Sequence, residues 1–489
     1  MAADEPFIFR TVRAETSSPD TLERPKAASQ RGRVHSNPAY SRLNSLVAIY
    51  VAASAIFAAV PVALARPQLW MAWVAMTALI SLVYLVLGAR FDRDRPLLSA
   101  RHPWLFGLAL LIPIYALFQS LPGLGGLVAG PPIPEALSPD TISILPGASQ
   151  MGALRFTGYI LFALLAIEVA SRPDRARRIG WWIFWGVVCH AIWALVALNL
   201  FGDIHIWGAD KSDYVGSATG TFINRNSFAT FLGMGATLGI GLLYERLDNP
   251  MTRKARVRTS LTSDRLDVVL VIVGLGLIGI TLLSTQSRMG VFASGIGAVT
   301  CFMIMRAKAG VSLWRILLST AVTGTIVLVL LLAVYGQDLL WRSVFVQSNA
   351  ELRGTGYGFI FGLISERPLL GFGFDAFRPA FEIVHVQPMN VDKIWDRAHS
   401  TYLAHWSELG LIVGSIPIIL GLLIAKRLTE IIRNRERDYG LSVAALAALV
   451  VAAIHSTVDF SLEMPANVAL LLAILGFGIA HRQTRQKQS

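Results

Sequence analysis

Two arginines at the edges of apolar stretches are the residues of this chain best suited to bind an anion. Arg288 lies in STQSRMG, which interrupts an apolar run over 268–305, and Arg225 lies in GTFINRNSFATF, just before another apolar stretch. A guanidinium is permanently charged and offers a planar fork of donors, so two of them suit a ligand with several anionic oxygens. The alternative for Arg288 is a side chain that reaches the interface only to anchor a hairpin.

Small polar side chains accompany both arginines. Asn224 and Asn226 flank Arg225, and Ser287 precedes Arg288. Asn226 could also cap the helix that follows it, so the polar residues alone do not establish a site. We include Asn224, Asn226 and Ser287 in the predicted anion-binding site.

A histidine opens the segment AHSTYLAHWSELGLIVG. His399 can titrate near neutral pH, so it is a candidate general base or a hydrogen-bond donor to phosphate, with Ser400 beside it. A structural role for a lone loop histidine stays open. Glu408 follows nine positions later, on the opposite face of a helix, so we expect it to face the bundle and anchor a loop.

A second histidine has a carboxylate within one helical turn. His455 and Asp459 in HSTVDFSLEMPAN share a helix face, and an ion pair or hydrogen bond between them would satisfy both near an interface. We predict a supporting role for this pair, and a catalytic role stays open.

The elements that position these residues are membrane helices. Of the 489 residues 54% are hydrophobic and only 15% are charged, too few to cover a soluble core of this size. Apolar stretches of about 17 to 22 residues recur, the length that crosses a bilayer. The sequence therefore predicts an all-α polytopic membrane protein with about 12 transmembrane helices. The predicted spans are 44–65, 68–89, 104–120, 151–170, 179–200, 227–244, 268–284, 289–305, 316–335, 406–425, 439–454 and 466–480.

The distribution of Lys and Arg gives the orientation. Basic residues concentrate in alternate loops and in both tails, so both termini are expected in the cytoplasm. This leaves a disordered tail at 1–43, helices over 44–335 and 406–480, a tail at 481–489, and a large loop at 336–405 with short helices on the periplasmic side of an inner membrane.

In this orientation Arg225, Arg288 and His399 all lie on the periplasmic side of the membrane. A polyprenyl diphosphate in the outer leaflet is a suitable anionic ligand for these arginines, because its tail partitions into lipid while its head lies level with them. The net charge of +12 follows from the basic loops and does not indicate nucleic acid. The spacing of His385, His399 and His405 does not suit zinc, and we predict no metal or other cofactor.

Four stretches in order resemble the superfamily of O-antigen ligases and O-antigen or exopolysaccharide polymerases. They are GTFINRN, SRMG, ERPLLGFGFDAF and the histidine-led segment that ends in Glu-x-Gly. Some ligases have an arginine three residues before the glycine of GTF; this chain has Ser217 there, and Arg225 would take its place.

The resemblance implies a bundle like that of C-type glycosyltransferases and metal-independent, inverting glycosyl transfer from an undecaprenyl-diphosphate-linked glycan. Arg288 and Arg225 would neutralise the leaving diphosphate and His399 would activate the acceptor hydroxyl. Arg353, in the large loop, and Ser400 become further candidates for binding sugar or phosphate.

The resemblance leaves the acceptor open. We predict a polymerase of exopolysaccharide or O-antigen repeat units that acts on an acceptor glycan, with a ligase to lipid A core as the alternative. Membrane lipids and polysaccharide co-polymerase or export proteins are the other expected partners. A transporter or flippase is the alternative of another class; it is disfavoured because Arg155 and Glu168 are nearly the only charges deep in the predicted spans.

Overall fold

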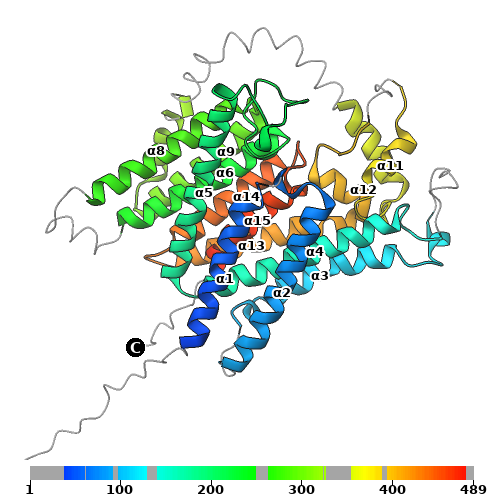
Figure 1. Ribbon diagram of the computed structural model, residues 1–489, viewed down its shortest axis with the longest axis horizontal. Coiled ribbons are helices and arrows are strands. Elements are labelled where there is room, and N and C mark those ends of the chain that lie inside the picture. Colours follow the sequence, from blue (N-terminus) through cyan, green and yellow to red (C-terminus); the bar gives the residue numbers. More distant parts are fainter. Residues whose placement is uncertain are drawn as a thin grey trace, which may run out of the picture.

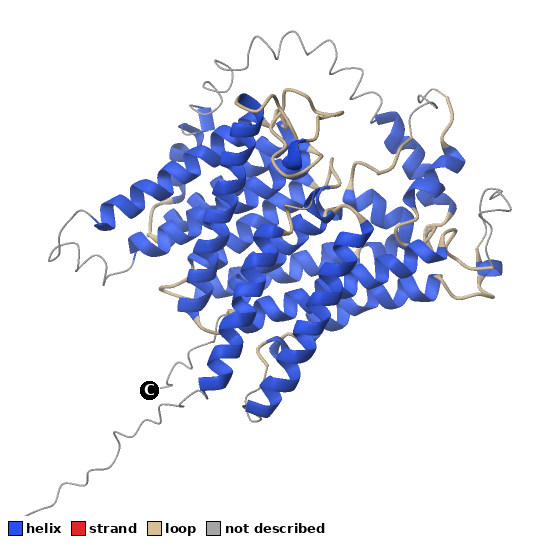
Figure 2. Cartoon of the chain, viewed as in Figure 1, coloured by secondary structure: helices blue, strands red, loops and turns tan. Residues whose placement is uncertain are grey.

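Helices make up the regular structure of the described chain (Figures 1 and 2). The computed structural model describes residues 38–60, 62–91, 97–128, 140–248, 263–322, 324–325, 354–387 and 394–480. The helices of the bundle are α1 (Pro38–Phe57), α2 (Pro67–Phe91), α3 (Pro103–Gln119), α4 (Pro146–Val169), α5 (Pro173–Asn199), α6 (Arg225–Asp248), α8 (Ser263–Ser284), α9 (Arg288–Lys308), α12 (Thr401–Gly414), α13 (Ile416–Asn434), α14 (Gly440–His455) and α15 (Pro465–Ile479). The short helix α11 (Phe377–Val384) lies beside α12, and residues 354–366 are also helical.

The fold confirms the predicted polytopic helical membrane protein, though not the count of twelve spans. Seven described helices are long and apolar enough to cross a membrane, namely α1, α2, α4, α5, α6, α8 and α9, and a bent pair of helices raises the number to eight. Helices α3, α14 and α15 are apolar but shorter. The tail at 481–489, most of the expected tail at 1–43 and just over half of the expected span at 316–335 fall outside the described residues, although α1 already begins at Pro38. The loop at 336–405 is described over 354–387 and 394–405.

The expected single helix over 406–425 is instead two helices. Helices α12 and α13 meet at 67°, and Gly410 within α12 has non-helical angles, φ 73° and ψ 169°. A neighbouring loop takes over the backbone groups there, since the Leu411 N–H donates to the Pro368 carbonyl at 2.7 Å. The hydropathy of this stretch does not reveal the bend, because the bend results from that loop.

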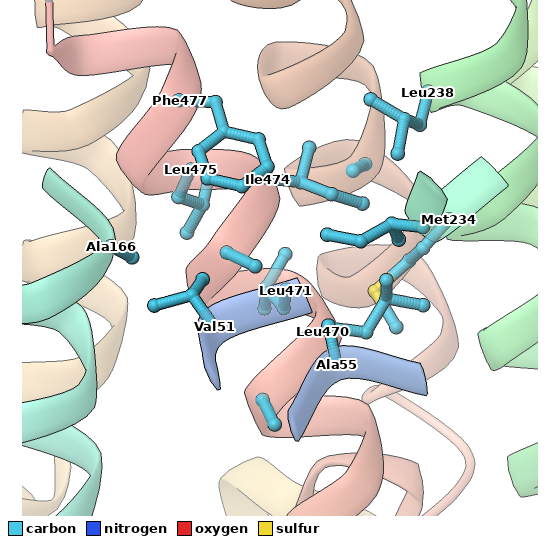
Figure 3. Packing of buried hydrophobic residues seen from close by; sticks show 14 of the residues in the cluster. Val51, Ala55, Ala166, Met234, Leu238, Leu470, Leu471, Ile474, Leu475 and Phe477 are labelled. Atoms are coloured by element: carbon cyan, nitrogen blue, oxygen red, sulfur yellow. The ribbon is translucent and has the colours of Figure 1, made fainter. Parts of the chain in front are cut away.

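Helix α15 lies in the middle of the core (Figure 3). Its side chains Leu470, Leu471 and Ile474 lie among residues of α1, α4 and α6. Small residues allow the close approach: a Cβ on Gly476 would lie 2.8 Å from the Ala166 side chain. Such contacts are how helices associate where the hydrophobic effect does not distinguish a neighbouring helix from lipid.

The functional motifs gather at one end of the bundle, where α6, α9, α12 and α15 begin and α14 ends. We call it the motif end. The Thr401 N–H donates to the Ser456 carbonyl at 3.0 Å, and the Asn467 side chain donates to the Ser227 carbonyl at 3.0 Å. The first bond ties the start of α12 to the end of α14, and the second ties the start of α15 to the start of α6.

The opposite end carries basic residues at the ends of α5, α9 and α13. There Arg177 contacts Asp438 at 3.4 Å, and the Lys308 ammonium donates to the Arg435 carbonyl at 2.7 Å. We call it the basic end. The segregation of polar motifs and basic loops to different ends agrees with the charge pattern of the sequence.

Candidate functional site

Arg225 is the first residue of α6. The Asn224 carboxamide oxygen accepts the Asn226 N–H at 2.7 Å, which satisfies one of the free amides at the helix start. The Arg225 guanidinium donates to the Ser217 hydroxyl at 3.1 Å and lies 5.4 Å from the centre of the Tyr214 ring. Arg225 therefore reaches position 217, the position at which some ligases of the predicted family have an arginine.

Arg288 is the first residue of α9, and its side chain is exposed. The Ser287 hydroxyl caps this helix by accepting the Gly290 N–H at 3.2 Å. A Cβ on Gly290 would lie 2.4 Å from that of Ala229, so α9 and α6 pack tightly near their starts.

The hairpin before α9 also contacts the loop that carries Ser217. The Ala218 N–H donates to the Ser284 carbonyl at 2.9 Å, and the Gln286 side chain donates to the Gly216 carbonyl at 2.9 Å. Arg225 and Arg288 thus begin adjacent helices on the same face of the bundle. Two helix N-termini add partial positive charge there.

His399 immediately precedes α12 and has a positive φ of 51°. Its ring packs edge-on against Trp395 at 5.3 Å and Phe460 at 5.5 Å, measured between ring centres. The Tyr357 hydroxyl donates to its carbonyl at 3.0 Å. Ser400 caps α12 and donates to the Ser456 carbonyl at 3.3 Å, so the histidine is fixed against the turn that follows α14.

His455 and Asp459 lie in a buried network, each 1% exposed. The His455 Nδ1 is 2.6 Å from the Thr230 hydroxyl and 3.9 Å from the Asp459 carboxylate. Asp459 accepts from the Asn226 side chain at 3.2 Å, and its carbonyl accepts from the Thr401 hydroxyl at 3.2 Å. These contacts join the starts of α6 and α12, the helices next to Arg225 and His399.

The motif PLLGFGFDAF docks on the break in α12. The N–H groups of Phe372 and Gly373 donate to the carbonyls of Ser407 and Glu408, both at 2.9 Å. Gly373 has φ 111° and passes so close to Ser143 that a Cβ would lie 2.1 Å from its hydroxyl, so a side chain does not fit. The Glu408 carboxylate accepts the Phe377 N–H at 3.2 Å at the start of α11.

A cavity of about 440 Å³ lies beneath this docked loop, between α4, α12, α13, α14 and α15. Its charged lining residues are Arg155, Asp375, Glu408 and Glu463, and His405 lies beside them. Arg155 contacts Asp375 at 2.6 Å, and Glu463 contacts Arg397, just outside the lining, at 2.6 Å. Within the described ranges no three His, Cys, Asp or Glu side chains are arranged to hold a metal ion.

Comparison with known families bears on these motifs. Residues 273–418 match the family model described as O-Antigen ligase. This confirms the predicted resemblance to the O-antigen ligase superfamily, and it supports glycosyl transfer of the O-antigen ligase or polymerase type. The chain matches no curated protein.

The O-antigen ligase region contains SRMG, PLLGFGFDAF and the His399 segment, while Arg225 and the turn at 455–467 lie outside it. The structure brings Arg225, Arg288, Ser287, Ser400 and His399 to the motif end. Arg353 lies outside the described residues.

The charged cavity was not predicted from the sequence. Glu408 was expected to face the bundle and anchor a loop, and in the structure it also lines the cavity. Arg155 gave a usable signal, because an arginine inside an apolar span requires a partner. The partner, Asp375, is 220 positions away, and local pattern does not indicate it.

Proposed function

We propose that this chain is a bacterial envelope glycosyltransferase that takes its donor glycan from undecaprenyl diphosphate and polymerises exopolysaccharide or O-antigen repeat units. One observation carries the proposal. Within the region matched by the family model, SRMG packs against the helix that begins with Arg225, and the histidine-led segment is joined to the start of that helix through Asp459. The general activity comes from the family match, and the donor and the acceptor are the proposed parts.

The chemistry is a single displacement at the anomeric carbon of the donor sugar. The acceptor oxygen forms a bond to that carbon while the bond to the diphosphate oxygen breaks, and the electron pair leaves with the diphosphate. Inversion at the carbon follows from attack opposite the leaving group. Arg225 and Arg288, at the starts of α6 and α9, would stabilise the negative charge that develops on the leaving group.

His399 would accept the proton of the acceptor hydroxyl. Its ring is held between Trp395 and Phe460, so its orientation is set before substrate binds. A positioned imidazole is a common general base for such a proton transfer. Asn224, Asn226, Ser287 and Ser400 would contribute donors around the diphosphate and the sugar.

Two guanidiniums would supply the charge that a divalent cation supplies in other transferases. We therefore propose metal-independent transfer with the motif end on the periplasmic face of the inner membrane, since the opposite end carries the basic residues expected in the cytoplasm.

A ligase to lipid A core is the second candidate, because the matching family model is described as O-Antigen ligase. The deciding experiment is transfer in vitro from a defined undecaprenyl-diphosphate oligosaccharide, with and without a chelator, to either a second lipid-linked repeat unit or lipid A core. Longer lipid-linked chains support the polymerase, and glycan on lipid A core supports the ligase. No transfer to either acceptor rejects the proposed donor chemistry, and loss of transfer with chelator rejects metal independence.

A further inference from the structure

The cavity between α4 and α13–α15 has one polar end and one apolar end. Its polar end contains Arg155, Asp375, Glu408 and Glu463, and apolar side chains of α13, α14 and α15 form the apolar end. A second apolar cleft of about 170 Å³ shares Phe156, Tyr159 and other lining residues with it and reaches α3. The combined space suits an amphiphile with a hydrocarbon chain.

The polar end does not suit a phosphate head. Arg155 is already paired with Asp375, and Arg397 with Glu463, each at 2.6 Å. Glu408 is a third carboxylate in the wall. Because both guanidiniums already have carboxylate partners, a diphosphate would find no unpaired guanidinium among these wall residues. Arg225, Arg288 and His399 do not line this cavity.

Four polar atoms of the lining have no hydrogen-bond partner among the described residues: the Tyr159 hydroxyl, one carboxylate oxygen of Glu463, the Nδ1 of His405 and the Ser456 hydroxyl. Tyr159 is only 9% exposed. Buried polar groups are nearly always hydrogen-bonded, so these four call for a ligand with donors and acceptors. Sugar hydroxyls provide both.

The polar end also adjoins the proposed catalytic segment. Thr401 and Ser456 line the cavity, and Thr401 is two residues from His399. The Thr401 N–H donates to the Ser456 carbonyl at 3.0 Å. A sugar held at the polar end would therefore lie against the segment that carries His399.

We propose that this cavity is a second ligand site and that it binds a glycolipid whose hydrocarbon chain carries an uncharged sugar. The hydrocarbon chain of the ligand lies between α13, α14 and α15, and its sugar hydroxyls form hydrogen bonds with Tyr159, Glu463 and His405. The donor diphosphate stays apart, at Arg225 and Arg288. The binding of this amphiphile does not depend on the proposed function.

The test uses the full chain in phosphatidylcholine nanodiscs and an alkyl maltoside with a photoreactive group in its alkyl chain. Gly421 lines the cavity, and a Cβ there would be 3.8 Å from its nearest neighbour, Leu449, so Gly421→Phe should fill the cavity with little strain. The matched control is Gly276→Phe, on an exposed face of α8 where a Cβ meets nothing within 4 Å.

The expected result is labelling of α13–α15 that unlabelled alkyl maltoside suppresses, that Gly421→Phe abolishes and that Gly276→Phe leaves intact. Tyr159→Phe should weaken alkyl maltoside binding about threefold to tenfold, the usual effect of losing one hydrogen bond. The binding of a plain alkyl alcohol should not change. Equal competition by an alkyl phosphate or alkyl phosphocholine would overturn the proposal, because the cavity would then be a general lipid cleft. Absence of labelling at α13–α15 would overturn it as well.

The binding and the proposed function have separate readouts. Labelling should persist in Arg288→Ala, which removes a proposed donor-binding residue only. Specific labelling without any glycan transfer by the unmodified chain would reject the proposed function and leave the binding site standing.

Discussion

Arg155 on α4 donates to the carboxylate of Asp375 at 2.6 Å, across 220 positions of sequence. Asp375 has φ 61° and follows a glycine-rich loop that hydrogen-bonds to the break in α12. The ion pair thus joins a membrane helix to the loop that closes the charged cavity.

Removing this carboxylate should change what the cavity binds. Asp375→Asn leaves Arg155 without its anionic partner, so alkyl phosphate should compete for the cavity where it did not before. The fold should lose about 3 kcal/mol, because a largely buried guanidinium is left unpaired. Competitive photolabelling and thermal unfolding measure the two effects. Arg155→Met combined with Asp375→Asn is the control and should recover stability without gaining phosphate binding.

Arg288 should be required for transfer and not for insertion. Arg288→Ala is expected to lower the rate of glycan transfer about 100- to 1000-fold, the usual effect of removing one charge-stabilising group. Arg288→Lys should restore part of the rate, since it keeps the charge and loses the fork. Arg66, exposed at the turn before α2, provides the control Arg66→Ala. Full activity of Arg288→Ala in the same membranes would reject the proposed role.

His399 combines a chemical role with an unusual backbone. Its positive φ of 51° is tolerated by asparagine and glycine better than by alanine. We expect His399→Asn to fold like the unmodified chain and to transfer glycan about 100-fold or more slowly. Equal rates would mean that the histidine serves only to pack between Trp395 and Phe460.

Gly410 should be required for the fold. A Cβ at this position would lie 2.2 Å from the Leu369 carbonyl oxygen, and its φ is 73°. Gly410→Ala is therefore expected to destabilise the chain by about 3 kcal/mol. The control is Gly276→Ala, which meets nothing within 4 Å. Size-exclusion profiles and thermal unfolding of the purified variants provide the comparison.

Glu463 should give the stability a pH dependence. Burial raises the pKa of its carboxyl above the ordinary 4.5, and the charge of Arg397 only partly opposes this. A raised folded-state pKa contributes stability below pH 4.5 that is lost as the pH rises through the folded value. The difference between the melting temperature of the unmodified chain and that of Glu463→Gln should therefore decrease as the pH rises from 4. A rise instead would show that the ion pair with Arg397 outweighs burial.

Hydropathy, charge and motif order could be read directly from the sequence. The helical membrane fold follows from apolar stretches that must satisfy their own backbone hydrogen bonds in lipid. Arg225, Arg288 and His399 were recognisable because each lies at the boundary of an apolar stretch, where a polar residue is conspicuous. Local pattern also placed the helix starts at 225 and 288 within a few residues.

The charged cavity was decided only by the tertiary structure. Asp375, Glu408 and Glu463 come from three separate segments, and nothing local distinguishes them from carboxylates that face solvent. The bend at Gly410 likewise depends on a loop that begins some forty residues earlier and takes over backbone groups of α12. Sequence alone determined that the chain is a helical membrane protein, since that depends on the transfer free energy of its apolar segments. Which charges meet inside the bundle depends on packing between distant segments, and that is a property of the folded chain.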